Sequence, residues 1–466
     1  MQSPKIVVIG AGSYFFGRPA IWNMVSSEIL REGTLALVDT DEKVLATMMG
    51  IARRAIDHAG TKTAVEGSTD RRAVLAGADF VLLSFSNRNA YYRGVDCQIS
   101  AKHGIRMCSG DTIGPGGVFR ALREVPKALA MARDVEELAA DAWLINFVNP
   151  TSVLGIALMR HSPIKSFALC DGQHEPHNRV RILKQAGVLP DDATVIPPEV
   201  EQKLTLNIIG VNHFSWMTEF RYDGVDMMPK WREIIAVQSK EELSQAKHGG
   251  RTSDDNAYSK AKFNSTYALR LMDVFGAYPR QIGHTKEYVP FFQGYGAADV
   301  EPEPITIFDA TERQAKMDEF MKVNRQYASG ERPIAEFFAG GKGDHATDII
   351  ESMWGGLGKA FYVNTANRGA VSNMADDAFL ELRSHLDMNG PVPIPAGAMP
   401  RGILGMQQQV LDTHELTAEA AITCDRGVLL RALATDPIVN NLVDAEAVID
   451  DLLEAERPEL PAGWYD

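Results

Sequence analysis

The feature that most constrains the fold is the stretch KIVVIGAGS near the N-terminus. Residues 5–9 form a short, apolar and β-branched run, which is typical of a strand buried on both faces of a parallel sheet. The glycines that follow, Gly10 and Gly12, let the backbone approach a pyrophosphate group closely. Phe15 occupies the third glycine position of the usual dinucleotide-binding fingerprint. The stretch predicts a strand, a phosphate-binding turn and then a helix over about residues 19–31.

Strands and helices continue to alternate through the first third of the chain. Apolar runs that predict further strands lie at residues 34–39, at the end of 73–85, at 143–149 and at 166–170. Residues 119–139 show a long helical pattern that we expect to be interrupted at Pro126. This alternation of strands and helices predicts an α/β fold with a Rossmann-like, doubly wound parallel sheet over residues 1–185.

The remainder, residues 186–466, is less regular and predicts a mixed α+β domain for substrate and metal binding and for oligomerisation. Residues 203–222 alternate in polarity, which favours antiparallel or mixed strands. The polar segment 247–260 is a loop or lid candidate, and the pattern from residue 416 is helical up to Pro437.

Charge and cysteine content exclude several classes of partner. The formal net charge is −14 and the pI is about 5.3, which argues against nucleic acid or an anionic membrane as partner. The four cysteines are irregularly spaced and give no disulfide framework, so we expect a reducing cytoplasm. We see neither a signal peptide nor an apolar run of the roughly 18 residues that a membrane span needs.

Asp39 strengthens the nucleotide hypothesis because it ends the second predicted strand, where a carboxylate can accept hydrogen bonds from ribose hydroxyls. It would repel a 2′-phosphate, which favours NAD over NADP. The competing interpretation is a tight turn with a helix-capping aspartate. The predicted cofactor-binding residues are Gly10, Gly12, Ser13, Tyr14, Phe15, Asp39 and Asn87.

A second glycine-rich segment, SGDTIGPGG at residues 109–117, precedes the long helix. Arg120 and Arg123 share one face of that helix by their i,i+3 spacing. Backbone N–H groups and two arginines at a helix start would suit an anionic or polyhydroxylated ligand. The alternative is a flexible loop beside a solvated arginine face.

Polar side chains also occur where three predicted strands end: Asn149, the pair Cys170-Asp171, and the pair Asn212-His213. In an open α/β sheet, ligands collect outside the carboxyl ends of the strands. Cys170 and His213 could supply one sulfur and one nitrogen ligand to a divalent metal. Two protein ligands are too few for a structural zinc site but suit a catalytic metal completed by substrate and water. Taken singly, each residue is more often part of a core.

Six segments occur in the order IGAGS, LALVD, GDTIGPGGVFRALREVP, NFVNP, ALCD and GVNHFSW, followed by LTAEAAITCDRGVLLRALATDP near the C-terminus. Together they resemble the NAD- and manganese-dependent glycosidases of glycoside hydrolase family 4 over nearly the whole chain. The resemblance implies that NAD removes a hydride from C3 of the sugar and that a base then takes the C2 proton. The metal stabilises the resulting charge, the aglycone is eliminated from C1, water adds, and NADH returns the hydride.

The resemblance also implies roles for individual residues. Cys170 and His213 match the metal ligands, and Asp171 or Asp111 matches the general acid, with Asp171 preferred. The Glu-Tyr-x-Pro motif that follows the family's base segment is present at residues 287–290, but the usual Asp-Arg pair is absent. His284 or Tyr278 therefore becomes the candidate base. The predicted substrate-binding residues are Asn149, Asn212, Arg88 and Arg280.

The same family acts on glycosides of glucose, galactose, uronic acids and 6-phosphosugars, and its relatives include NAD-dependent sulfoquinovosidases. We expect a small-molecule glycoside, with or without an anionic group at C6, and a homodimer or homotetramer. Candidate cations for such a group are Arg88, Arg93, Arg280 and Lys286. The alternatives are an NAD-dependent hydroxy-acid or sugar dehydrogenase, which would release NADH stoichiometrically, and a nucleotide-sensing protein.

Overall fold

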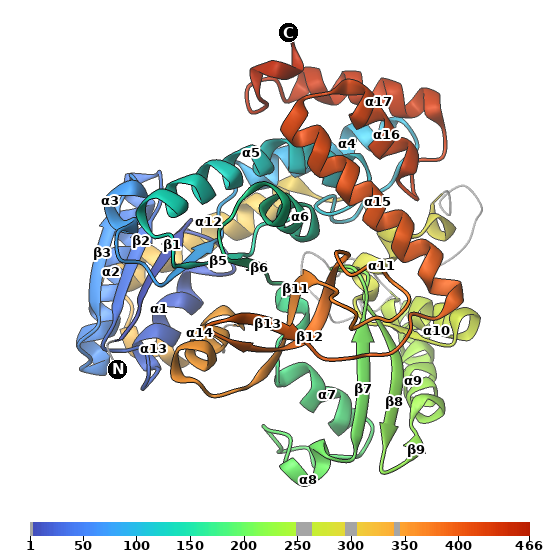
Figure 1. The fold of residues 1–466 in the computed structure, drawn as a ribbon, viewed down its shortest axis with the longest axis horizontal. Coiled ribbons are helices and arrows are strands. Elements are labelled where there is room, and N and C mark those ends of the chain that lie inside the picture. Colours follow the sequence, from blue (N-terminus) through green and yellow to red (C-terminus); the bar gives the residue numbers. More distant parts are fainter. Residues whose placement is uncertain (1–2, 248–262, 294–304, 340–344) are drawn as a thin grey trace.

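The computed structural model describes residues 3–247, 263–293, 305–339 and 345–466. Its centre is a nine-stranded sheet in the order β13-β12-β11-β6-β5-β4-β1-β2-β3 (Figure 1). The six strands from β6 to β3 run parallel, and β11 to β13 extend the sheet in antiparallel fashion. These strands are β1 (Lys5–Ile9), β2 (Thr34–Val38), β3 (Ala64–Ser68), β4 (Phe80–Leu83), β5 (Trp143–Asn146), β6 (Ser166–Ala168), β11 (Ala360–Ala366), β12 (Phe379–Asp387) and β13 (Gly390–Pro393).

Both faces of this sheet are covered by helices, which explains the unbroken apolar runs in its strands. On β1, Val7 and Ile9 pack into one core while Ile6 and Val8 pack into the other. The first face carries α3 (Arg72–Leu75), α4 (Asn89–Lys102), α5 (Gly114–Leu138), α6 (Thr151–His161), α15 (Arg401–Thr423), α16 (Arg426–Thr435) and α17 (Leu442–Ala455). The second face carries α1 (Gly17–Ser26), α2 (Glu42–Ala59), α12 (Ala310–Ser329), α13 (Ile334–Ala339) and α14 (His345–Gly355). The predicted doubly wound α/β class is confirmed.

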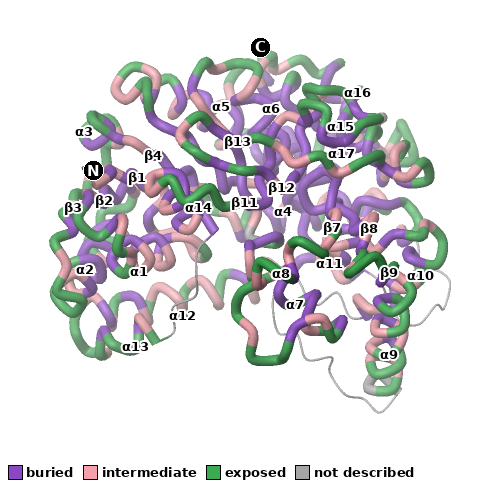
Figure 2. The backbone as a smooth tube through the Cα atoms, turned by 60° about the horizontal axis from the view of Figure 1, so that its bottom comes forward, coloured by how far each residue is buried: buried purple, intermediate pink, exposed green. Residues whose placement is uncertain are grey.

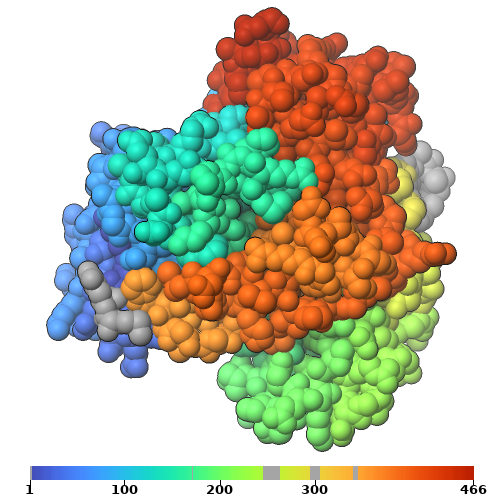
Figure 3. Space-filling view, viewed as in Figure 1, coloured from blue at the N-terminus to red at the C-terminus, as the bar shows by residue number. Residues whose placement is uncertain are grey.

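A smaller antiparallel sheet forms a separate lobe, seen in green at the bottom of Figure 3. It consists of β7 (Leu204–Ile209), β8 (Trp216–Tyr222), β9 (Val225–Asp226) and β10 (Tyr278–Pro279), in agreement with the predicted antiparallel strands. An isolated bridge between Gly210 and Glu381 joins it to β12 of the main sheet. The helices that accompany this sheet are η1 (Asp171–Gln173), α7 (His177–Gln185), α8 (Pro198–Glu201), α9 (Met228–Lys247), α10 (Asn264–Phe275), α11 (Ile282–Tyr288) and η2 (Pro290–Phe292). The last element along the chain is η4 (Ala462–Trp464).

The buried backbone forms a continuous band through the main sheet and its junction with the small lobe (Figure 2). Strands β11 to β13 come from beyond residue 185 yet belong to the N-terminal sheet. The proposed division into residues 1–185 and 186–466 stays a prediction. Within the described residues, no helix is both long and apolar enough to span a membrane.

Several predicted elements differ from the observed ones. Pro126 does not interrupt its helix: α5 is continuous, because packing against α6 and α15 outweighs the one hydrogen bond that a proline removes. The first helix spans Gly17–Ser26, not residues 19–31. Strand β3 was not predicted, since AVEGS is a half-exposed edge strand without an apolar run. The C-terminal helical pattern is split in two by Cys424, whose φ is 55°. The predicted loop 247–260 lies outside the described residues, apart from Lys247 at the end of α9.

Candidate active site

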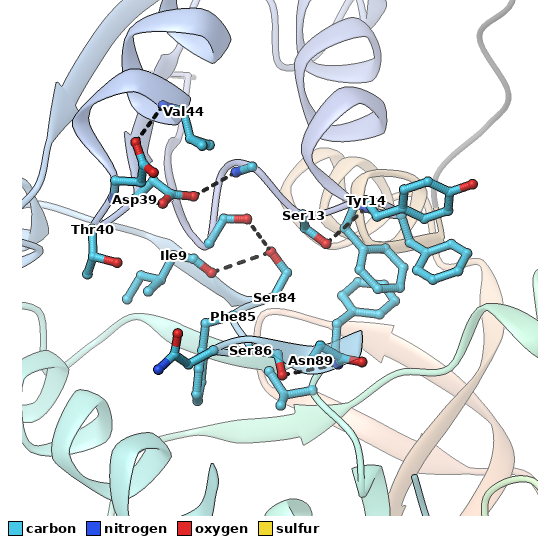
Figure 4. Close-up of a pocket in the computed structure, with 18 of the residues that line it drawn as sticks. Ile9, Ser13, Tyr14, Asp39, Thr40, Val44, Ser84, Phe85, Ser86 and Asn89 are labelled. Carbon is cyan, nitrogen blue, oxygen red and sulfur yellow. Dashed lines mark hydrogen bonds between the residues drawn. The ribbon is translucent and has the colours of Figure 1, made fainter. Parts of the chain in front are cut away.

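A pocket of about 660 Å³ opens at the carboxyl ends of β1 and β4, at the point where the strand order of the parallel sheet reverses (Figure 4). This is where doubly wound sheets bind nucleotides, and the volume is that of a ligand site. The lining includes every residue predicted to bind the cofactor: Gly10, Gly12, Ser13, Tyr14, Phe15, Asp39 and Asn87.

The glycine turn is closely packed. A Cβ on Gly10 would lie 2.6 Å from the Ser84 carbonyl oxygen, and its φ of 94° favours glycine. The Gly12 N–H donates to the Asp39 Oδ2 at 2.9 Å, so the carboxylate also fixes the turn (Figure 4). Asp39 thus holds the turn and lies in the pocket wall, but it is not the helix cap, because Asp41 caps α2 by accepting from the N–H groups of Lys43 and Val44.

The missing third glycine is present two residues later. A Cβ on Gly17 would lie 2.1 Å from the carbonyl oxygen of Ala11, so this is where helix α1 approaches the turn most closely. In the usual fingerprint the third glycine serves this purpose. The fingerprint of this chain is therefore GxGxxxxG, two residues longer than usual, with the aromatic residues Tyr14, Phe15 and Phe16 between Gly12 and the helix.

We expect Gly17→Ala to weaken both folding and nucleotide binding, because the added methyl group must displace the turn or the helix. The melting temperature should fall by several degrees, and the dissociation constant for NAD should rise about tenfold or more. Calorimetry and ligand titration measure the two effects. Gly405→Ala in α15 is the matched control, since no atom lies within 4 Å of its added Cβ. Equal behaviour of the two variants would contradict this account.

Helix α12, from the second half of the chain, also borders the pocket, which the sequence did not reveal. Arg313, Met317 and Met321 belong to the lining. The Tyr14 ring packs against Phe320 of α12 with centroids 4.9 Å apart, so the aromatic insert contacts this helix. No local motif in residues 310–329 indicates this contact, because it depends on how distant segments pack.

Asp111 of the glycine-rich segment is fully buried and surrounded by donors. Its Oδ2 lies 3.5 Å from guanidinium nitrogens of both Arg93 and Arg120, and it accepts from the Asn149 side-chain amide at 3.3 Å. Its other carboxylate oxygen accepts from the Ser109 hydroxyl. Burial opposes ionisation, but the two arginines outweigh it and hold the pKa of Asp111 well below its ordinary value. Asp111 is therefore an anion near neutral pH.

The expectation that Arg120 and Arg123 face one ligand is wrong for Arg123. Arg120 lines the pocket, whereas Arg123 is buried in an ion-pair cluster with Asp96 and Glu456. Helical spacing put both arginines on one face but did not reveal that the C-terminal residues around Glu456 cover one of them. The glycine-rich segment is also not a loop over its whole length, because α5 begins within it, at Gly114.

Cys170 and His213 come together as predicted, with 3.1 Å between Sγ and Nε2. Bonds of about 2.3 Å to sulfur and about 2.1 Å to nitrogen, at an angle of about 90° to 110°, would separate two ligand atoms by about 3.1 to 3.6 Å. The observed spacing therefore fits two neighbouring ligands of one divalent ion. Cys170 is half-buried and ends the extended chain after β6, and its sulfur accepts from the Gly172 N–H at 3.4 Å.

His213 is held in an unusual backbone conformation. Its φ of 65° lies in the left-handed region, which costs free energy for a residue with a Cβ. Gln407 of α15 fixes the turn by accepting from the Val211 N–H at 2.7 Å and donating to the Phe214 carbonyl at 2.8 Å. A strained residue held by surrounding contacts is typical of functional sites.

His284 stacks on His213 with ring centroids 4.0 Å apart and planes 8° apart. Donor atoms of Asp111, His213 and His284 all lie within 4.8 Å of one another, the one such cluster found among the described residues. A metal ion lies in the plane of each imidazole that binds it, so the two stacked rings cannot both bind one ion in this arrangement. The geometry favours His213 as the ligand and leaves His284 for another role.

Glu287, in α11, was noted in the sequence only as part of a motif. It is buried, and one carboxylate oxygen accepts from the backbone N–H groups of Ser109 at 2.5 Å and Gly110 at 3.2 Å. The other oxygen lies 4.0 Å from Nδ1 of His284. Burial raises the pKa of Glu287 to about 7. Glu287 therefore connects the Asp111 segment to the His284 ring.

The other residues predicted to bind substrate or to take part in catalysis differ in their burial and in their distance from the pocket. Arg88 is exposed and stacks over the Tyr91 ring at 4.3 Å, outside the residues that line the pocket. Arg280 is half-buried beside the small sheet, and its Nε and Nη2 have no hydrogen-bond partner in the described part of the chain. Asn212 is buried next to His213, and burial raises the pKa of Tyr278. Asp171 begins η1 directly after Cys170.

Comparison with known proteins identifies the family. The model of family 4 glycosyl hydrolases matches residues 5–184, and that of the family 4 glycosyl hydrolase C-terminal domain matches residues 208–439. The chain belongs to the family 4 glycosyl hydrolases and is a glycosidase. The dehydrogenase alternative is not favoured.

Three relatives illustrate the range of this family. The chain is 27% identical to an alpha-galactosidase and 29% identical to an alpha-galacturonidase, both of Bacillus subtilis, over 98% and 97% of its length and 99% and 97% of theirs. It shares its fold with a 6-phospho-alpha-glucosidase from gut microorganisms solved in complex with NAD and Mn²⁺, with a TM-score of 0.75, 20% identity and 99% coverage of each chain. The three names specify three different sugars, so similarity alone does not identify the substrate.

Proposed function

We propose that this glycosidase cleaves its substrate by the NAD- and metal-dependent route, with NAD in the pocket between β1 and β4 and a divalent ion, Mn²⁺, on Cys170 and His213. The observation that carries the proposal is the direct link between the two places. Asn149 lines the pocket and donates to Asp111, whose carboxylate lies in the same cluster as His213. A simple hydrolase has no need of a dinucleotide pocket beside a Cys-His pair.

Different residues would bind the cofactor, the sugar and the metal. Asp39 would accept from ribose hydroxyls at the strand end, and Asn149 would bind hydroxyl groups of the sugar. When bound, NAD supplies reversible hydride transfer at C3 and the metal supplies charge stabilisation at the C2 and C3 oxygens. Cys170 and His213 would hold the ion, as their spacing of 3.1 Å fits.

The charge states of the buried side chains distinguish the candidates for the general acid and for the base. Asp111 is held as an anion by Arg93 and Arg120 and cannot donate a proton near neutrality, which favours Asp171 as the acid that protonates the leaving oxygen. Burial lowers the pKa of His284, which keeps the imidazole neutral and able to accept the C2 proton. Burial raises the pKa of Tyr278, so the phenol keeps its proton, which favours His284 as the base.

The substrate class is proposed from two cations, the half-buried Arg280 and the buried Lys286. Two guanidinium nitrogens of Arg280 and the ammonium group of Lys286, which lies 5.4 Å from the centre of the Tyr267 ring, lack hydrogen-bond partners among the described residues, and burying a polar cation without hydrogen bonds is costly. An anionic substituent on the sugar, such as a C6 carboxylate, phosphate or sulfonate, would offset that cost. The four cysteines form no disulfide in the described part of the chain, which supports a reducing, cytoplasmic location, and a homodimer or homotetramer remains our expectation from the family.

A panel of nitrophenyl glycosides tests the proposal. It should contain neutral sugars, uronides, 6-phosphates and sulfoquinovosides, each assayed with and without NAD and Mn²⁺. We expect hydrolysis of one anionic class, falling at least about a hundredfold when either cofactor is stripped. In deuterated water the released sugar should carry deuterium at C2. Undiminished hydrolysis by the stripped protein would contradict the mechanism, and a preference for neutral sugars would contradict the proposed substrate class alone.

A further inference from the structure

Glu381, the third residue of β12, is a buried carboxylate that the mechanism does not use. Its side chain is 1% exposed. One carboxylate oxygen accepts from the Asn212 amide at 3.3 Å, and the other accepts from the Ser215 hydroxyl at 2.9 Å. Its backbone N–H donates to the Gly210 carbonyl at 2.8 Å, which makes the bridge between the two sheets. Glu381 thus contacts both ends of the turn that carries His213.

The same network extends to the turn that follows Cys170. The Gln173 amide donates to the Ser215 hydroxyl at 3.1 Å, and Gln173 is the last residue of η1, which begins one residue after Cys170. Hydrogen bonds therefore run from Gln173 through Ser215 to Glu381, and from Glu381 to Asn212. At one end of this path Asn212 adjoins His213, and at the other Gln173 ends the short helix that begins directly after Cys170.

We propose that Glu381 is a positioning residue that sets the spacing of Cys170 and His213. Its carboxylate accepts directly from Asn212 and Ser215 of the turn that carries His213, and Ser215 in turn accepts from Gln173 of the turn after Cys170. The inference rests on the proposed function, since it assumes that this pair holds the metal. Groups that orient ligands in this way are often nearly as important for metal affinity as the ligands themselves.

The direction of every hydrogen bond makes the prediction specific. Gln173 donates to Ser215, Ser215 donates to Glu381, and Asn212 also donates to Glu381. Two donors thus converge on two carboxylate oxygens. In Glu381→Gln, an amide NH₂ group of nearly the same size would face one of these donors. Asn212 or Ser215 must then move, and with it the turn that carries His213, although the volume of the buried side chain is preserved.

The test measures Mn²⁺ binding directly, by electron paramagnetic resonance of free Mn²⁺ in titrations of the purified full-length protein with NAD present. We expect Glu381→Gln to raise the dissociation constant for Mn²⁺ about 10- to 100-fold, with NAD affinity within about twofold of the unchanged protein. Glu219→Gln is the matched control, because Glu219 also accepts from an amide, that of Asn207 at 3.0 Å, but is not part of the network described above. The control should bind Mn²⁺ normally.

Ser215→Ala keeps the inference testable if Glu381→Gln fails to fold. It removes the hydroxyl between Gln173 and Glu381 while Asn212 keeps its acceptor, so we expect a weaker, several-fold loss of Mn²⁺ affinity in the same direction. Folded variants that bind Mn²⁺ as tightly as the unchanged protein would overturn the role of Glu381 alone. Absence of Mn²⁺ binding by the unchanged protein would instead overturn the metal site of the proposed function.

Discussion

Cys170→Ser should reduce kcat/KM at limiting Mn²⁺ by at least about a hundredfold while NAD binding persists. A thiolate is a strong ligand for a divalent ion, whereas a serine hydroxyl remains protonated near neutral pH and has a shorter bond to its carbon. The Ser hydroxyl can still accept from the Gly172 N–H, as the sulfur does at 3.4 Å, so the turn after β6 should be preserved. Excess Mn²⁺ should restore part of the lost activity.

Steady-state hydrolysis over a series of Mn²⁺ concentrations measures this effect, and NAD titration provides the readout of an intact pocket. Cys424→Ser is the control, because Cys424 lies between α15 and α16, next to Gly463, and is not among the residues that line the pocket. A Cys170→Ser enzyme with the Mn²⁺ dependence of the unchanged protein would remove Cys170 from the metal site. Loss of NAD binding together with activity would indicate a folding defect instead.

The fold could be predicted because buried parallel strands leave a clear pattern. β1 alternates Val7 and Ile9 with Ile6 and Val8 between two cores, which produces a run that is apolar throughout. Edge strand β3 leaves no such run, because none of its residues is buried and its sequence, AVEGS, contains a charged residue and a glycine. The strands β11 to β13 could not be assigned to the first sheet from local sequence, since the amino-acid composition of a strand does not indicate which sheet edge it pairs with.

The candidate site was predictable where strand ends determine it. Cys170 and His213 follow strands of different sheets and still meet at 3.1 Å, as the motifs suggested. Contacts between distant segments were not predictable. Glu381 lies 166 residues from Ser215, and Arg123 lies 333 residues from Glu456. The roles of Glu381 and Arg123 could not be predicted from local sequence, because each role depends on a segment far along the chain that buries the side chain.

Arg123→Met should produce the largest loss of stability among the variants considered. Arg123 is 4% exposed, and its guanidinium donates to Asp96 at 2.9 and 3.2 Å and also to Glu456. Removal of the cation leaves two buried carboxyl groups close together, and burial with the nearby Asp96 already raises the pKa of Glu456 well above its ordinary value. Breaking a buried ion pair in this way typically costs about 3 to 5 kcal/mol.

We therefore expect the melting temperature of Arg123→Met to fall by roughly 3 to 5 °C in calorimetry. Arg232→Met is the matched control: Arg232 pairs with Asp273 at 2.6 Å, but both side chains are more than 40% exposed, and such pairs contribute at most about 1 kcal/mol. Adding Asp96→Asn to Arg123→Met should recover part of the loss, since one buried carboxylate is removed. An unchanged melting temperature with a large loss of affinity for NAD or for the sugar would show that Arg123 binds a ligand after all.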